Sequence, residues 1–372
     1  MNPRNPYRHE ISFDQHVWLP STSQNYRSIV DLIEDRDFVE KLIKSRLEVA
    51  LHITEHSPVA SNKILSALSE TDIAKVRKKI ADLGDVETRH SLISIGSHHF
   101  PEMRGKMQTT TANPPDHIHR MQRGQWYIGD LYSADMVGSS LANLGISFAP
   151  RANYLDFGCS SGSLIRALKA FSPESVFHGV DPIVSSIEWA QRHIPGSHFS
   201  VSDTVPPLKH EAGSFQGVTA ISIWSHLGEN EALAWFDEMH RVIEDGGWLF
   251  FTTHGDSAIS YFNRDPAHST RRILALLEGL INNDYVFEEV YLGKSPEGLS
   301  ATGYGNAYFR RSWVERNLSK KWEIVHFGAA ENQGNQDVYV LKKLPSTLTS
   351  QISSMVTSPL RRVWRKKTKL SK

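Results

Sequence analysis

The chain of 372 residues lacks a second cysteine, a long apolar run and a net charge. Its single cysteine, Cys159, excludes an internal disulfide framework and any multi-cysteine metal site. No apolar run approaches membrane-spanning length, and the polar start Met1–Pro6 is unlike a signal peptide. We therefore expect a cytoplasmic protein that buries at least one large core.

Charge is balanced overall but unevenly placed. Residues 361–372 carry seven basic side chains and no acid, so the rest of the chain sums to −7. An acidic body argues against a nucleic-acid partner. Apolar residues at helical spacing precede the basic end, and two interpretations of residues 345–372 remain open. One is peripheral contact with an anionic membrane surface at its inner face, and the other is a disordered basic tail.

Residues 1–124 are interpreted as an N-terminal arm followed by a helical extension. Apolar positions recur at helical spacing from Tyr26 to Leu68, and a further helix is expected from Thr71, as its cap, to Leu83. Residues 86–123 are polar and proline-rich, which indicates a loop. Two of its histidines, His117 and His119, raise a metal site as the alternative. Because cysteines and a helical histidine pair are lacking, we expect no metal ion.

From residue 153 onward, short apolar strands alternate with helical patterns, which is typical of a doubly wound parallel sheet. An earlier helix is expected at Ser133–Leu144. The expected strands are Tyr154–Phe157, Val176–Asp181, His198–Ser202, Val218–Trp224 and Trp248–Thr253, with helices at Ser163–Ala170, Ile183–His193 and Glu229–Ile243. Two later strands, Trp322–Phe327 and Asp337–Leu341, form an antiparallel hairpin around the turn Gly328–Gln336. Residues 256–320 are expected to contain a helix near Thr270–Asn282. Part of this segment is expected to form a substrate wall or lid.

The stretch from Asn153 to Ser163 has the pattern of a ligand-binding turn. An apolar strand reaches Asp156, and small residues follow at alternate positions before a helix begins: Gly158, Ser160 and Gly162. Small residues let a backbone come close to a ligand, and helix N-terminal amides face it. Asp181 and Asp203 follow the next two strands. Helix capping is the alternative role for any one acid, but the set of three indicates a cofactor site.

The spacing D-x-G-x-S-x-G at residues 156–162 resembles motif I of class I methyltransferases that depend on S-adenosylmethionine (SAM). The resemblance implies a Rossmann-like sheet of seven strands, the last antiparallel, after the helical extension. It implies SAM as the cofactor, with Asp156 at its amino group, Asp181 at the ribose and Asp203 at the adenine. The full implied binding set is Asp156, Gly158, Cys159, Ser160, Gly162, Asp181, Pro182, Asp203 and Ile221. Two positions depart from the family pattern, since Ser160 replaces a glycine and Gln216 replaces an aspartate before the fourth strand.

Further short motifs resemble one bacterial methyltransferase subgroup that is often found with glycosyltransferases. They include Ile223-Trp224-Ser225-His226-Leu227 and Gln336-Asp337-Val338-Tyr339-Val340-Leu341, within a matched region of residues 125–343. The subgroup implies O-methylation of a glycan or glycolipid intermediate, with possible glycosyltransferase partners. A small metabolite, a protein side chain and a non-catalytic SAM-binding scaffold are the alternatives.

Methyl transfer to a hydroxyl needs a base, and two histidines follow the fourth and fifth strands at the edge where an acceptor enters. These are His226 and His254, and imidazole titrates near neutrality. Glu229 is a weaker candidate for the same role. Capping or packing is the alternative for His226. Tyr127 is a possible wall of the cofactor site.

Overall fold

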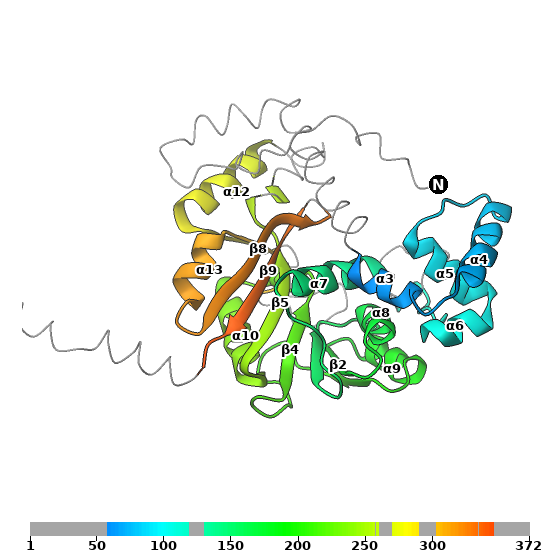
Figure 1. Ribbon diagram of the computed structural model, residues 1–372. Coiled ribbons are helices and arrows are strands. Elements are labelled where there is room, and N and C mark those ends of the chain that lie inside the picture. Colours follow the sequence, from blue (N-terminus) through cyan, green and yellow to red (C-terminus); the bar gives the residue numbers. More distant parts are fainter. Residues whose placement is uncertain are drawn as a thin grey trace, which may run out of the picture.

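The computed structural model describes residues 58–118, 130–256, 258–259, 270–289, 303–333 and 335–345. These residues are organised around a seven-stranded sheet in the order β3-β2-β1-β4-β5-β9-β8 (Figure 1). The strands are β1 Asn153–Phe157, β2 Val176–Asp181, β3 His198–Val201, β4 Phe215–Ala220, β5 Ile243–Thr253, β8 Trp322–Asn332 and β9 Gln336–Lys343. Strands β1 to β5 pair in parallel, and β9 runs antiparallel to both β5 and β8. The predicted fold class is confirmed.

Helices cover both faces of this sheet. The described helices, which include α4 to α6 beside the sheet, are α3 Val59–Leu65, α4 Glu70–Asp82, α5 Arg89–His99, α6 Pro101–Met107, α7 Leu131–Asn143, α8 Ser163–Phe171, α9 Val184–His193, α10 Glu229–Val242, α12 Thr270–Asn283 and α13 Arg311–Leu318. Along β5, Trp248 and Phe250 pack into the core shared with α7 and α8, while Phe251 packs into the core shared with α10 and α13. Burial on both faces explains why these strands are apolar throughout rather than alternating.

Helix α4 begins with a capping box. The hydroxyl of Ser69 accepts from the Asp72 amide at 3.2 Å, and the Asp72 carboxylate accepts from the Ser69 amide at 3.0 Å. The predicted cap, Thr71, is therefore wrong by two positions. A hydrogen bond from Lys106 to the same carboxylate, at 2.7 Å, lowers the pKa of Asp72 to about 2. This contact holds α6 against the start of α4.

Residues 86–123 were expected to form a polar loop, and this prediction is wrong for α5 and α6. Thr88 and Ser91 form a capping box at the start of α5. The helix then buries consecutive residues from Leu92 to Ser97, so its apolar positions do not show the 3.6-residue spacing of a surface helix. Helix α5 packs against α3, α4 and α6, which makes it the centre of the N-terminal helices.

Strand boundaries in β4 and in the hairpin also differ from the sequence expectation. Strand β4 ends at Ala220 because Ser222 has a left-handed backbone, with φ of 63°. It begins at Phe215, so Gln216 lies inside the strand, where it accepts a hydrogen bond from the Tyr154 hydroxyl. The hairpin strands extend to Asn332 and from Gln336, so the predicted turn Gly328–Gln336 is too long.

The connection between β5 and β8 adds a layer at the carboxyl end of the sheet. Besides the predicted helix α12, it contains a small antiparallel sheet of β6 (Tyr285–Glu288) and β7 (Asn306–Phe309), followed by α13. Neither the small sheet nor α13 was predicted. In Figure 1, α12 and α13 lie on the side of the sheet away from α3 to α6.

Several expectations concern residues outside the described ranges. They include the arm at residues 1–23, His119, Tyr127 and the tail beyond residue 345. Within the described ranges, no helix is both long and apolar enough to cross a membrane.

Candidate active site

The turn between β1 and α8 is built from three residues with left-handed backbones. Their φ angles are 76° at Gly158, 48° at Ser160 and 74° at Gly162. A non-glycine residue in this region costs about 1–2 kcal/mol. Ser160 tolerates it because its amide donates to the Asp181 carboxylate at 2.8 Å. The serine that departs from the family pattern is therefore strained but held in place.

Packing explains two of the small residues. A Cβ atom on Gly158 would collide with the Ile223 side chain. One on Gly162 would lie 2.6 Å from Ile194 Cδ1 and 2.9 Å from Phe199 Cε1. Both glycines are thus required by neighbouring side chains, in addition to any ligand that approaches the turn.

Asp156 lies near the end of β1 with 5% of its surface exposed. Its carboxylate accepts a hydrogen bond from the Thr219 hydroxyl at 2.9 Å. Burial raises the pKa of Asp156 to about 7, and the charges of Asp130 and Asp181 raise it further, against the lowering effect of Thr219. A buried carboxyl of this kind gains from a cation beside it. The site therefore fits a positively charged ligand group.

Asp181 ends β2 and joins two backbone segments. It accepts from Ser160 on the turn and from Ile183, the residue before α9, at 2.9 Å. Asp181 does not cap α9, because Ile183 is the N-cap residue and the helix has no side-chain cap. Pro182 directly follows Asp181 at this edge of the sheet. Burial raises the pKa of the Cys159 thiol, which is next to Ser160, well above its usual range. These contacts order the turn around the expected ribose position, but the ribose assignment stays a prediction.

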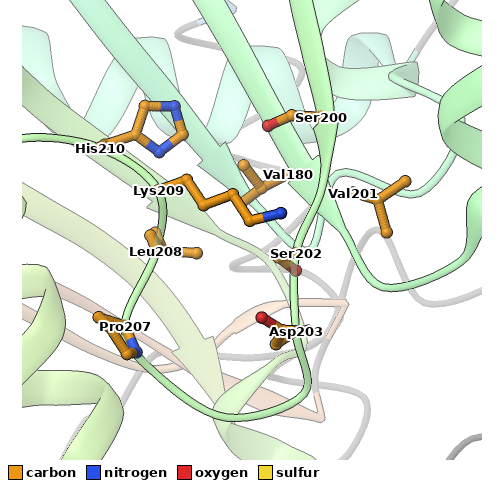
Figure 2. Close-up of a pocket in the computed structure, with 9 residues that line it drawn as sticks. All are labelled: Val180, Ser200, Val201, Ser202, Asp203, Pro207, Leu208, Lys209 and His210. Atoms are coloured by element: carbon orange, nitrogen blue, oxygen red, sulfur yellow. The ribbon is translucent and has the colours of Figure 1, made fainter.

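Asp203 lies beyond β3, beside a small hollow (Figure 2). Figure 2 shows the Lys209 side chain between those of His210 and Ser202. The hollow has a volume of about 10 Å³, which is room for one water molecule and not for an adenine ring. An adenine beside Asp203 must therefore lie outside this hollow.

The two predicted base candidates are brought together beyond β4 and β5, with ring centroids 6.4 Å apart. His254 follows β5 and is 7% exposed. Burial lowers the pKa of His254 to about 3, and the charge of His226 adds to this effect. Its ring stacks on Tyr308, with 5.2 Å between centroids. An imidazole with this pKa is neutral at pH 7 and is a weak base.

His226 is better arranged for accepting a proton. It ends the short 3₁₀ helix η2, Trp224–His226, and is half-buried. Its Nδ1 lies 2.9 Å from the Gly305 carbonyl, which can only accept, so Nδ1 carries the proton and Nε2 keeps the lone pair. Burial lowers the pKa of His226. His226 does not cap α10, since Gly228 occupies that position.

Glu229, the weaker base candidate, is engaged elsewhere. Its carboxylate accepts from the buried indole of Trp313 at 2.7 Å. This contact ties the start of α10 to α13. The arrangement therefore favours His226 over Glu229 as the proton acceptor.

Sequence reasoning missed a polar cluster behind the end of β4. The backbone amide of Ser222 donates to the Thr252 hydroxyl at 2.8 Å, and this hydroxyl donates to the side-chain oxygen Oε1 of Gln336 at 2.7 Å. The side-chain nitrogen Nε2 of Gln336 donates in turn to the Ser222 hydroxyl. This cluster holds the bend that places Ile223 over Gly158. Ile221, which belongs to the implied SAM-binding set, is half-buried and packs against the core shared with α7 and α8. Gln336 appeared in a quoted motif, but nothing in the sequence revealed its partners.

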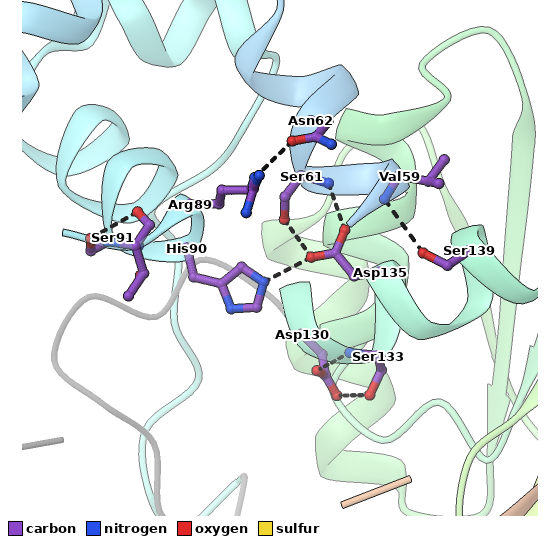
Figure 3. Close-up of polar contacts among 11 residues, drawn as sticks. Val59, Ser61, Asn62, Arg89, His90, Ser91, Asp130, Ser133, Asp135 and Ser139 are labelled. Atoms are coloured by element: carbon purple, nitrogen blue, oxygen red, sulfur yellow. Dashed lines mark hydrogen bonds and ion pairs between the residues drawn. The ribbon is translucent and has the colours of Figure 1, made fainter. Parts of the chain in front are cut away.

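Helix α7 connects the N-terminal helices to the β1–α8 turn. At its start, the Asp130 amide donates to the Ser163 carbonyl at 3.0 Å. One turn later, fully buried Asp135 accepts from the Ser61 amide at 2.7 Å and the Ser61 hydroxyl at 2.6 Å (Figure 3). His90 on α5 lies 2.8 Å from the same carboxylate. The N-terminal helices therefore support a helix that borders the site.

Metal chemistry finds no support in the described part of the chain. Its histidine, cysteine and carboxylate side chains form no group of three or more that is arranged to hold a metal ion. His117 lies in a turn after α6, and the neighbouring His119 is outside the described residues.

Residues 136–285 match the family model of a methyltransferase domain. This match covers less than half of the chain, and it begins within α7 and extends to the first residue of β6. It supports methyltransferase activity and the expected cofactor, SAM. The narrower glycosyltransferase-associated subgroup is not distinguished by it.

Several solved structures are similar to the chain. A SAM-dependent methyltransferase from Methanosarcina mazei is 17% identical, with 53% of this chain and 94% of that chain covered and a TM-score of 0.38. Magnesium protoporphyrin IX methyltransferase from Synechocystis PCC 6803, with bound SAH, is 14% identical, with 60% and 90% covered and a TM-score of 0.38.

Proposed function

We propose that the chain binds SAM at the β1–α8 turn and transfers its methyl group to an acceptor hydroxyl. The observation that carries the proposal is the strained turn from Asp156 to Gly162, held by Asp181. When bound, SAM supplies an electrophilic methyl group on a sulfonium. In this proposal Asp156 pairs with the cofactor's amino group, because burial leaves its carboxylate in need of a cation. Asp181 accepts from the ribose hydroxyls.

His226 acts as the base in the proposed reaction. Its Nε2 would accept the proton of the acceptor hydroxyl, and bound SAM would supply the methyl group to the acceptor oxygen. In such a displacement, alignment of the acceptor with the methyl group is the main catalytic contribution. The Nδ1 contact with Gly305 supports this role for His226.

For the acceptor, we propose a hydroxyl of a glycan or glycolipid intermediate. The proposal is supported by the resemblance of the motifs between residues 206 and 341 to the glycosyltransferase-associated subgroup. A methyltransferase acting on a small metabolite or a protein side chain is the second candidate. It is favoured if extracts without glycan contain the methylated product.

The proposed domain organisation follows the sequence. Residues 1–124 form the arm and helical extension, residues 125–343 form the methyltransferase domain, and residues 344–372 form the basic tail. Residues 256–320 contribute to a substrate lid, which is supported by the place of β6 and β7 beyond the carboxyl end of β5.

The tail at residues 345–372 is proposed to contact an anionic membrane surface, and glycosyltransferases that act there are the proposed partners. Its charge supports this idea, since the last twelve residues hold seven cations. Truncation after residue 344 is expected to abolish sedimentation with anionic liposomes. Equal sedimentation of the two proteins would contradict the membrane proposal.

Calorimetry and thermal unfolding with SAM test the cofactor assignment. We expect a saturable heat and an increase in Tm for the wild-type chain. D181A is expected to weaken SAM binding at least tenfold. E188A, which removes an exposed acid on α9, is the matched control and is expected to leave SAM binding unchanged. No heat and no Tm shift with the wild type would contradict the cofactor assignment, whereas SAM binding without methyl transfer would favour the non-catalytic SAM-binding scaffold. Radiolabelled methyl transfer into glycan then tests the acceptor.

A further inference from the structure

The loop that carries His226 pairs with a three-residue segment from the β5–β8 connection. The Gly228 amide donates to the Gly303 carbonyl, and the Gly305 amide donates to the His226 carbonyl, both at 2.7 Å. Between these bonds, Leu227 and Tyr304 form an antiparallel bridge. We name residues 303–305 the clip. It aligns the backbone of the whole His226 loop.

Both glycines of the clip are required by close neighbours. Gly303 has φ of 72°, and a Cβ atom there would lie 2.7 Å from the Glu231 carboxylate. A Cβ atom on Gly305 would collide with the Glu288 carbonyl oxygen. Residues 303–305 therefore lie close to Glu231 of α10 and to the Glu288 carbonyl of β6.

The clip also touches the His226 ring in two ways. The Gly305 carbonyl accepts from Nδ1 at 2.9 Å, and the Tyr304 ring stacks on the imidazole at a centroid distance of 5.2 Å and an angle of 25°. The hydrogen bond selects the tautomer, and the stack fixes the plane of the ring. Together they determine which nitrogen carries the lone pair and where it points.

We propose that the clip is a positioning element that holds His226 in its Nδ1–H tautomer, with Tyr304 as the side chain that orients the ring. This inference rests on the proposed function, because it assigns the clip a part in acceptor deprotonation. The tautomer and the orientation of the His226 ring can be measured without any catalytic reaction. The state of the base is then set by the β5–β8 connection rather than by the central sheet.

Tyr304 also affects the titration of His226. The groups facing the ring are Tyr304 from the clip and His254 from the end of β5. Burial keeps the pKa of His226 below its usual value. Replacing Tyr304 by leucine admits water to one face of the ring, so the pKa rises toward its ordinary value of about 6.5. The acid limb of a pH–rate profile then moves to higher pH.

Long-range ¹H–¹⁵N NMR on histidine-labelled full chain tests the clip directly, with H226Q used to assign the signal. We expect wild-type His226 to show the Nδ1–H tautomer and Y304F to keep it, because phenylalanine retains the stacked ring. Y304L is expected to give a mixture of tautomers and a higher titration midpoint. Y304M, with more volume, replaces Y304L if the latter fails to fold.

Y285F is the matched control. The Tyr285 hydroxyl donates to the Leu227 carbonyl at 2.7 Å, so this variant disturbs the same loop without touching the imidazole. We expect it to lower Tm while leaving the His226 tautomer unchanged. A wild-type Nε2–H tautomer, or an unchanged tautomer and titration in the leucine and methionine variants, would overturn the proposal.

The NMR result needs neither SAM nor acceptor, so failure of the proposed function leaves it interpretable. Once methyl transfer is measured, Y304L is expected to lower kcat by about tenfold and to move the acid limb of kcat/KM upward. Y304F is expected to stay within about twofold of wild type. A fall in kcat with an unmoved acid limb would contradict the positioning role.

Discussion

Asp156 shows how one residue can couple the cofactor site to pH. Its folded pKa of about 7 exceeds the value of about 3.8 expected in the unfolded chain, so the folded state binds more protons between these values. The stabilisation is complete below the unfolded pKa and is lost as pH rises through about 7. Each pKa unit corresponds to about 1.4 kcal/mol.

For D156N we therefore expect stability to improve relative to wild type as pH rises from about 5 to about 8, in the absence of SAM. Urea unfolding at the two pH values measures this difference. D203N is the control, since it changes an acid beyond β3 without entering the β1 end. A constant difference between D156N and wild type would show that Asp156 is already ionised at pH 5.

His226 and His254 are expected to differ in their contribution to kcat. H226Q is expected to lower kcat about 100-fold by removing the base, while H254Q lowers it less than about tenfold. SAM affinity should be unchanged in H226Q, because the proposed mechanism assigns this side chain to the acceptor and not to the cofactor. Single-turnover methyl transfer and calorimetry separate these effects. An equal loss in both variants would indicate that the pair acts as a unit.

Among the elements, the bend after β4 depends on Ser222 and its partner Gln336. S222A and S222G both remove the hydroxyl, but only glycine accepts a φ of 63° without strain. We expect S222G to be more stable than S222A by about 1–2 kcal/mol. Chemical denaturation of the two variants provides the comparison. Equal stabilities would mean that the backbone at residue 222 relaxes.

The central elements could be predicted from sequence because their signals are local. Buried strands such as Val176–Asp181 are apolar runs, and they were placed correctly. Helix α5 was missed because its buried residues are consecutive, and β4 was misplaced because its end is set by Ser222. The clip could not be found at all, since Gly303 and Gly305 acquire meaning only through contacts with residues about 80 positions away.

At the scale of the whole molecule, α7 links the N-terminal helices to the β1–α8 turn. Removing the Asp135 carboxylate in D135A leaves the Ser61 amide and hydroxyl without their acceptor. We expect a loss of about 3–5 kcal/mol in unfolding free energy and weaker SAM binding, because α7 also contacts Ser163. S61A should cost less, since the backbone amide keeps its bond. Denaturation and calorimetry on the full chain measure both effects.

The candidate site was only partly predictable for a related reason. Asp156, Asp181 and the turn between them follow from chain order, because parallel strands end at one edge of the sheet. Ile223 over Gly158, and Tyr304 over His226, depend on how the bend and the clip fold onto that edge. Motif spacing carries no information about either contact.

Gly162 leads to a different kind of conclusion. A Cβ atom at this position would collide with Ile194 and Phe199, which belong to the hydrophobic core. A descendant of this chain that had lost catalysis would still be selected to keep the glycine in order to fold. Retention of Gly162 in a relative would therefore indicate the shared architecture and would say nothing about catalysis.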